Sequence, residues 1–190
     1  MRISFIISTF ARPQTLLACL TTLALQTEKD SEFIVTDNTR DLDLAEHNAY
    51  FVKLSGSRFK YVRTLKEECY SSAEDGVRLA TGKYIAFPSD DDFIVPAFGE
   101  LMANKCDTES LDFTYSDGIY DDWNGKRYNI FNTEPRVNRI DKCSFLMRRE
   151  IFTEFPNKAR VSDSDGRLVE ELVRKGYRHS KTDGILWVHC

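Results

Sequence analysis

Hydrophobic and polar residues follow two different rhythms along the first half of the chain. Short continuous apolar runs bounded by polar residues are typical of buried strands, whereas apolar residues three or four positions apart indicate a helix packed against a sheet. The strand pattern occurs at 3–8, 33–36, 59–62 and 84–87, and the helical pattern at 16–24, 42–54 and 72–80. Strands that alternate with helices predict an α/β fold with a mostly parallel, doubly wound, Rossmann-like sheet covered on both faces.

This alternation weakens after about residue 95, where the pattern is more typical of an α+β arrangement. The second half is expected to contain helices at 97–105 and 168–175, strands at 111–116, 126–131 and 185–188, and a further apolar run at 143–147. Residues 121–125 have the composition of a turn between two strands. We therefore expect this half to add a small antiparallel portion, built of hairpins, to the edge of the main sheet.

Length, charge and cysteine spacing exclude several classes of protein. The 190 residues fit one domain, so we expect 1–190 to be a single unit. The 26 basic and 30 acidic residues give a net charge of −4, so nucleic acid is not an expected partner. The five cysteines are widely spaced without a C-x-x-C pair, which favours reduced, packed thiols in the cytoplasm. No apolar run reaches the about 18 residues of a transmembrane segment.

Polar residues stand at the ends of the predicted strands, which is where α/β sheets bind ligands. Thr9 and Asp37 end two strands, and Asp90, Asp91 and Asp92 follow a third. Adjacent carboxylates repel one another unless a cation neutralises them, and hard oxygen ligands suit Mg2+ or Mn2+. The alternative is a solvated acidic turn in which an aspartate caps the next helix. The position of the triplet directly after a buried strand favours a metal site.

Two segments of the first half resemble the inverting family 2 glycosyltransferases of the GT-A fold. Residues 8–12 read Ser-Thr-Phe-Ala-Arg, like the segment that ends the first strand in that family, and Asp37 matches the aspartate that ends a following strand. Residues 76–92 begin G-x-x-x-A-x-G, continue through Tyr-Ile-Ala-Phe and end in the aspartate triplet, where the family has a D-x-D-type metal motif. Order, spacing and strand–helix context agree over this whole stretch.

The resemblance implies a division of labour between the two halves. Residues 1–92 would bind a nucleotide sugar, and residues 93–190 would hold the acceptor and the catalytic base. Asp91 would bind a Mn2+ or Mg2+ ion. Asp90 would lie on the ribose side of the donor, and Asp37 would face the nucleobase of the donor, which is most often uracil. The residues implied in nucleotide-sugar binding are Thr9, Phe10, Arg12, Asp37 and Asp90.

A second match concerns the catalytic base. In the family an acidic motif opens a helix that ends in Gly-Tyr, and an aspartate of this motif is the base. Counted back from residues 176–177, Asp165 matches that base, while Asp163 is a second candidate because Ser164 stands where a glutamate is common. The alternative is a cluster at 162–165 that only caps the helix.

His189 is the second implied metal ligand, because it resembles a late histidine that coordinates metal in some GT-A enzymes. The alternative is a packed or solvent-facing side chain. Two departures from the family concern the donor: Ser89 replaces the first carboxylate of the D-x-D motif, and Glu74 and Asp75 replace a common Arg-Asn pair.

The resemblance implies transfer of a sugar, with inversion, from a nucleotide-diphosphate donor such as a UDP-sugar to a glycan or other hydroxyl acceptor, as in cell-surface polysaccharide synthesis. A peripheral association with a membrane or a partner protein would supply further acceptor surface. One alternative is a nucleotidyltransferase. That class usually has a glycine-rich phosphate loop after its first strand, and residues 8–12 contain no glycine. Another is a non-catalytic module that binds nucleotide sugars or glycans, because Ser89 and Ser164 replace family carboxylates.

Overall fold

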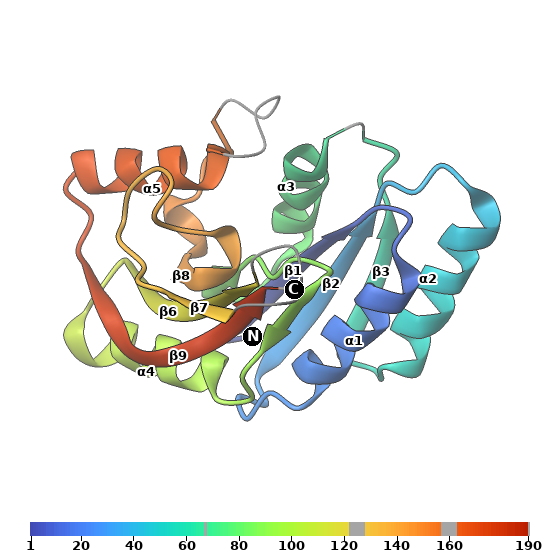
Figure 1. The fold of residues 1–190 in the computed structure, drawn as a ribbon, viewed down its shortest axis with the longest axis horizontal. Helices are drawn as coiled ribbons and strands as arrows, with labels where there is room; N and C mark the ends of the chain where they lie inside the picture. Colours follow the sequence, from blue (N-terminus) through green and yellow to red (C-terminus); the bar gives the residue numbers. More distant parts are fainter. Residues whose placement is uncertain (67, 122–127, 157–162, 190) are drawn as a thin grey trace.

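A single mixed sheet runs through the molecule, with helices on both of its faces (Figure 1). The computed structural model describes residues 1–66, 68–121, 128–156 and 163–189, and within these residues the sheet has nine strands. The fold class predicted from the hydrophobic pattern is therefore present.

The first half contains β1 (Ile3–Thr9), α1 (Pro13–Ala24), β2 (Ser31–Asp37), α2 (Leu42–Leu54), β3 (Phe59–Arg63), α3 (Cys69–Leu79), β4 (Tyr84–Ala86) and β5 (Asp92–Ile94). The second half contains α4 (Phe98–Glu109), β6 (Phe113–Asp121), β7 (Tyr128–Phe131), η1 (Lys142–Ser144), β8 (Phe145–Arg148), η2 (Arg149–Ile151), α5 (Ser164–Arg174) and β9 (His179–His189), where η marks a short 3-10 helix. Strand β5 was not predicted, and β9 begins earlier than expected. Most of the predicted turn at 121–125, and residues 126–127, lie outside the described residues.

The strand order is β3-β2-β1-β4-β8-β6-β9-β5, with β7 also paired to β6. Strands β3, β2, β1 and β4 are parallel, as the strand–helix alternation predicts. Antiparallel pairing enters at the edge of this parallel part, where β8 joins β4, and it recurs between β8 and β6, β6 and β7, and β9 and β5. The second half thus continues the same sheet beyond β4, which brings its last strand into contact with β5.

The helices bury two separate apolar faces of the sheet. On one face, Phe5 and Ile7 of β1 pack among apolar residues of α1 and α4; on the other, Ile6 packs among residues of α3 and α5. All residues of β1 and β2 are buried, which explains their continuous apolar runs. Helix α3 can lie close to β1 because Gly76 has no side chain. A Cβ atom at residue 76 would come within 2.5 Å of Ile6 Cγ2.

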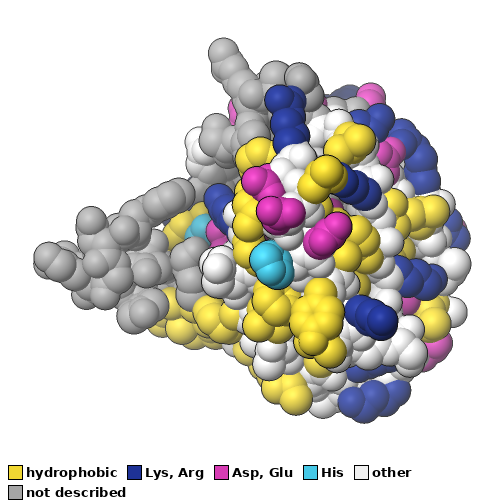
Figure 2. Space-filling model, turned by 90° about the vertical axis from the view of Figure 1, so that its right-hand side faces the viewer, with side chains coloured by type: hydrophobic (Ala, Val, Ile, Leu, Met, Phe, Trp, Pro, Cys, Tyr) yellow, Lys and Arg dark blue, Asp and Glu magenta, His cyan; other side chains and the backbone are white. Residues whose placement is uncertain are grey.

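The outer side of α2 is less hydrophobic than its buried side but still carries apolar residues. Leu42, Tyr50 and Leu54 are each more than half exposed. On this side of the molecule, hydrophobic side chains are interspersed with charged side chains of both signs (Figure 2). Three free cysteines, Cys19, Cys106 and Cys143, are buried, in agreement with the packed thiols predicted from their spacing.

A buried carboxylate ties the starts of the central strands together, away from the strand ends that carry the aspartate triplet. Glu32 of β2 is 1% exposed and pairs in register with Ser4 of β1. It accepts hydrogen bonds from the Ser4 hydroxyl (2.7 Å), from the Thr81 amide and hydroxyl (2.8 and 2.6 Å) and from the Lys60 ammonium (2.7 Å). Burial alone would raise the pKa of Glu32, but the bonds from Lys60, Thr81 and Ser4 lower it to about 2.

Replacing Glu32 with glutamine is expected to destabilise the fold by about 1–3 kcal/mol at pH 7, the usual cost of losing hydrogen bonds to a charged group. Because the native pKa lies below the usual value of 4.5, the wild type loses this contribution as the pH falls from about 4.5 toward 2. Denaturant unfolding of both proteins at pH 7 and pH 3 measures the effect. A stability difference that does not shrink at pH 3 would contradict the assignment.

Candidate active site

The aspartate triplet lies beside the end of the first strand. Residues Thr9 and Asp37 end β1 and β2 in register, and Ser8 forms an isolated parallel bridge to Ser89 beyond the end of β4. The thiol of Cys19 on α1 also donates a hydrogen bond to the Ser89 carbonyl, at 3.2 Å. These contacts hold the loop that carries Asp90 and Asp91 at the carboxyl edge of the parallel strands, where ligands of such sheets bind.

Two of the residues predicted to bind the nucleotide sugar, Thr9 and Arg12, form hydrogen bonds with the aspartate triplet at 90–92. The Thr9 hydroxyl donates to Asp90 Oδ2 (2.7 Å), and the Arg12 guanidinium lies 2.7 Å from Asp91 Oδ2 and 3.5 Å from Asp90 Oδ1. Burial raises the pKa of Asp90, an effect that the Thr9 hydroxyl opposes. The structure thus brings Thr9, Arg12, Asp90 and Asp91 together, and their roles toward a donor or a metal ion stay predictions.

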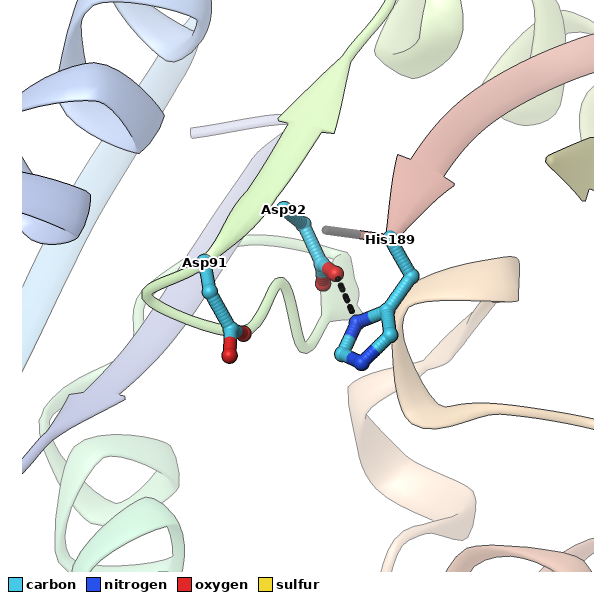
Figure 3. A group of neighbouring side chains, drawn as sticks. All are labelled: Asp91, Asp92 and His189. Atoms are coloured by element: carbon cyan, nitrogen blue, oxygen red, sulfur yellow. Dashed lines mark hydrogen bonds and ion pairs between the residues drawn. The ribbon is translucent and has the colours of Figure 1, made fainter. Parts of the chain in front are cut away.

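Asp92 is bound differently from its two neighbours, because it is fully buried and holds a histidine (Figure 3). Pairing of β5 with β9 places Asp92 opposite His189, and Asp92 Oδ1 lies 2.8 Å from His189 Nδ1. Its other oxygen accepts a hydrogen bond from the Ser89 amide, at 2.6 Å. Burial would lower the pKa of His189, but the hydrogen bond to Asp92 and the negative charges of Asp92, Asp141 and Asp91 together raise it.

The residues present fit a divalent cation. Ligand atoms of Asp91, Asp92 and His189 lie within 4.8 Å of one another, and carboxylate oxygen and imidazole nitrogen are ligands that Mn2+ accepts. Because both Asp92 oxygens are engaged, Asp91 and the second ring nitrogen of His189 are the atoms left to face an ion. Asp92 then orients the histidine, as carboxylates behind metal-binding histidines commonly do.

Asp37 lies in the predicted place but in an internal hydrogen-bond network. Its carboxylate is fully buried and accepts hydrogen bonds from the Thr39 amide (2.7 Å), the Asn48 side chain (2.9 Å) and the Tyr61 hydroxyl (2.7 Å). Asp37 therefore organises the loop after β2, and its contact with the nucleobase of a donor stays a prediction. Phe10, in contrast, follows β1 directly and is 52% exposed, so its ring is available to a ligand.

Asp165 lies in the first turn of α5 and is only 8% exposed. Burial, followed by the negative charge of Asp141, raises its pKa to about 7, although the Gly166 amide donates to Asp165 Oδ1 at 2.8 Å. A carboxylate with a pKa near neutrality suits a general base. Asp163 makes no side-chain cap to the helix and instead pairs with Arg167 at 2.8 Å. Of the residues proposed to form a cap, Ser162 lies outside the described residues.

Several contacts fix the helix turn that carries Asp165. Gly166 leaves room for the neighbouring loop, because a Cβ atom there would come within 2.6 Å of Val137 Cα. The Val137 amide donates to Glu170 Oε1 (2.9 Å), and Ser164 hydrogen-bonds to the Pro156 carbonyl. Glu74 of α3, which replaces a family donor residue, accepts a hydrogen bond from the Phe155 amide (2.9 Å). This glutamate therefore supports the chain that leads to α5.

The sequence interpretation missed Asp141. Asp141 caps η1, and its negative charge contributes to the raised pKa of Asp165, Asp92 and His189. The charge of Asp141 therefore acts on both the candidate base and the candidate metal cluster. The available signal was an Asp-x-x-Ser capping box at 141–144, which is common at helix starts and indicates no function by itself.

The architecture is that of the GT-A fold, which the chain shares with several solved structures. Similar solved structures are S. aureus TarS (TM-score 0.75, 17% identity, covering 100% of this chain and 36% of that one) and S. aureus TarS 1–349 in complex with UDP-GlcNAc (TM-score 0.75, 18% identity, 99% and 58% covered). A third is the mannosyltransferase PcManGT from Pyrobaculum calidifontis in complex with GDP-Man and Mn2+ (TM-score 0.76, 15% identity, 99% and 56% covered). The chain spans between about a third and three fifths of the length of these proteins.

Residues 4–164 match the sequence family described as Glycosyl transferase family 2, so the chain belongs to that family. The resemblance and fold inferred from the sequence are thereby confirmed. No curated protein sequence matches the chain. Among the described residues, no helix combines the length and the apolar character that crossing a membrane requires.

Proposed function

We propose that the chain is the metal-dependent catalytic domain of an inverting glycosyltransferase that uses a nucleotide-diphosphate sugar, with a UDP-sugar as the preferred donor. The observation that carries this proposal is a buried carboxylate with a pKa of about 7, together with a cluster of two aspartates and a histidine, since the negative charge of Asp141 acts on both. A general base and a cation that stabilises the leaving group are what direct displacement at a sugar carbon requires.

Each residue of the site has a role in this reaction. Asp165 takes the proton of the acceptor hydroxyl while the acceptor oxygen forms a bond to the anomeric carbon. The bond from that carbon to the β-phosphate oxygen breaks, and its electron pair remains on the departing diphosphate. Asp91 and His189 would hold a divalent cation, which when bound would neutralise charge on that diphosphate. Asp90 and Thr9 face the ribose side, and Phe10 covers the nucleoside.

The similar structures support the class of donor. TarS 1–349 was solved in complex with UDP and in complex with UDP-GlcNAc, and PcManGT was solved in complex with GDP-Man and Mn2+. We assign residues 1–92 to donor binding and residues 93–190 to the acceptor and the base, in a cytoplasmic protein that acts on a glycan or another hydroxyl acceptor in polysaccharide synthesis. A peripheral association with a membrane, or with a partner protein, would supply the remaining surface for the acceptor.

Thermal unfolding with UDP-, GDP- and dTDP-sugars, each with and without Mn2+, tests the proposal. A donor at about 100 times its dissociation constant adds about 2.7 kcal/mol of stability and raises the melting temperature. We expect the largest rise with a UDP-sugar and Mn2+ together. Release of free sugar or transfer to an acceptor then distinguishes an enzyme from a binding module, and no stabilisation by any nucleotide sugar would contradict the proposal.

Arg12 is expected to compete with the cation for Asp91, because its guanidinium lies 2.7 Å from the carboxylate. Replacing Arg12 with glutamine should strengthen Mn2+ binding in the absence of nucleotide by about two- to fivefold, the range of an exposed ion pair. Titration of free Mn2+ by electron paramagnetic resonance measures this. The control is Arg78→Gln, which breaks an ion pair with Asp75 on α3. Weaker Mn2+ binding by the Arg12 variant would contradict the expectation.

A further inference from the structure

Tyr120 is the aromatic neighbour of the candidate metal-binding histidine. Strands β5, β9 and β6 pair side by side, and their register places Asp92, His189 and Tyr120 in one row across the sheet. The centres of the Tyr120 and His189 rings are 4.6 Å apart, with 39° between the ring planes. In the part of the chain that the structure describes, no other aromatic ring contacts His189. The imidazole thus lies between a carboxylate on one strand and a phenol ring on the other.

This row depends on irregular pairing between β6 and β9. Ser116 pairs with Thr182, and regular pairing from there would place Tyr120 opposite Leu186. Two shifts of register after Ser116 bring His189 opposite Tyr120 instead. Bulges that re-aim a side chain are common beside active sites. The irregular pairing therefore determines which ring His189 contacts.

The Tyr120 ring is itself held from several sides. It packs edge to face against Trp187, with ring centres 6.2 Å apart, and beside Phe131, with ring centres 5.7 Å apart. Its hydroxyl donates a long hydrogen bond (3.4 Å) to Asp141 Oδ2, and Asp141 caps η1. Tyr120 therefore offers His189 a surface whose position is fixed by the surrounding sheet and by η1.

The hydrogen bond between Asp92 and His189 does not by itself fix the imidazole (Figure 3). It sets the direction of Nδ1, but the ring can still tilt about the line that joins Nδ1 to the carboxylate. Such a tilt displaces Nε2, the nitrogen that is left to face an ion. A ring packed against the imidazole opposes the tilt. Groups that orient a metal ligand in this way commonly contribute roughly 10- to 100-fold to metal affinity.

We propose that Tyr120 is a positioning residue of the metal site, which fixes the tilt of the His189 ring so that Nε2 faces the cation. This inference rests on the proposed function, in which Asp91 and His189 hold that ion. Tyr120 does not touch the ion itself. The aromatic ring does the positioning, whereas the hydroxyl contributes only a long hydrogen bond. Phenylalanine should therefore replace Tyr120, and an aliphatic residue should not.

Mn2+ binding to the full chain tests this role in the wild type, Tyr120→Leu, Tyr120→Phe and the control Phe131→Leu. Titration of free Mn2+ by electron paramagnetic resonance should show binding roughly tenfold or more weaker for Tyr120→Leu. Tyr120→Phe should bind close to the wild type. Phe131 packs against Tyr120 and Trp187, so the control removes a ring from the same cluster and should keep the Mn2+ affinity.

The coupling of bound Mn2+ to nitrogen nuclei, measured by electron spin echo, provides the second readout. A coordinated imidazole nitrogen produces this coupling. We expect it in the wild type and in Tyr120→Phe, in weakened form in Tyr120→Leu, and not in His189→Ala. Adding Tyr120→Leu to His189→Ala should cause no further loss of Mn2+ affinity, because the ring then has no ligand to position. A purely structural role would weaken binding equally in both backgrounds.

Melting temperatures of all variants accompany the titrations. If Tyr120→Leu does not fold, Tyr120→Met gives the same comparison, since its longer, flexible side chain fills more of the space. Wild-type Mn2+ affinity in the folded aliphatic variant, or an equal loss with and without His189, would overturn the role of Tyr120 and leave the proposed function intact. A wild type without nitrogen coupling, or His189→Ala that binds Mn2+ as tightly as the wild type, would overturn the role of His189 in the proposed function and this inference with it.

Discussion

Replacing Asp165 with asparagine is expected to lower the transfer rate by roughly 100- to 10,000-fold, the usual contribution of general acid–base catalysis. Asparagine keeps the size of the side chain and its hydrogen bond from the Gly166 amide, but it accepts no proton from the acceptor. Donor affinity should stay close to that of the wild type. Initial rates and donor affinity measured on the same preparations check both statements, and Asp163→Asn is the matched control.

The same variant is expected to be more stable than the wild type at alkaline pH. The native pKa of Asp165 is about 7 against a usual 3.8, so the wild type loses stability as the pH rises from about 4 to about 7. At pH 8 the advantage of Asp165→Asn should reach about 2–4 kcal/mol without metal, because each unit of pKa shift corresponds to about 1.4 kcal/mol. It should vanish near pH 4. A variant that is less stable at pH 8 but catalyses at the normal rate would identify Asp165 as a helix cap.

Replacing Asp91 with alanine is expected to abolish the effect of Mn2+ on UDP binding. Asp91 contributes a carboxylate oxygen to the cluster with His189, and no other described acidic residue of that cluster has a free oxygen. The fold should survive, because Asp91 lies on a loop and forms its ion pair with the half-exposed Arg12. Calorimetric titration of UDP with and without Mn2+ measures the loss.

The control for this experiment is Asp183→Ala, which removes an exposed carboxylate from β9 at a distance along the strand from His189. Its UDP affinity should still rise on addition of Mn2+. An Asp91 variant that melts as the wild type does, and whose UDP affinity still depends on Mn2+, would show that the cation binds elsewhere.

The parallel half of the fold was predictable because its signals are local. Strands β1, β2 and β4 each contain a short apolar run, and each is followed by a residue or turn that ends it. Strand β5 is only three residues long and starts within the aspartate triplet, so it is too short to show an alternation of apolar and polar residues. Its pairing with β9, which brings Asp92 to His189, depends on the complete sheet.

The side-chain partners within the site were less predictable than its location. The sequence placed Asp37 at a strand end but gave no sign that Thr39, Asn48 and Tyr61 would occupy its oxygens. Asp141 lies about fifty residues from Asp92 along the chain, so only the folded chain shows that its negative charge raises the pKa of that buried carboxyl. Electrostatic relations of this kind arise from packing and leave no pattern in a single sequence.

The pairing of β5 with β9 also determines when the site can form during synthesis. Asp92 and His189 are separated by 97 residues, so the ribosome must deliver nearly all of the described chain before the two can meet. Contacts between such distant positions form late in folding and slow it. Until β9 is added, β6 and β5 expose unpaired strand edges to other nascent chains. The chain is therefore most prone to aggregate just before the cluster of Asp91, Asp92 and His189 is complete.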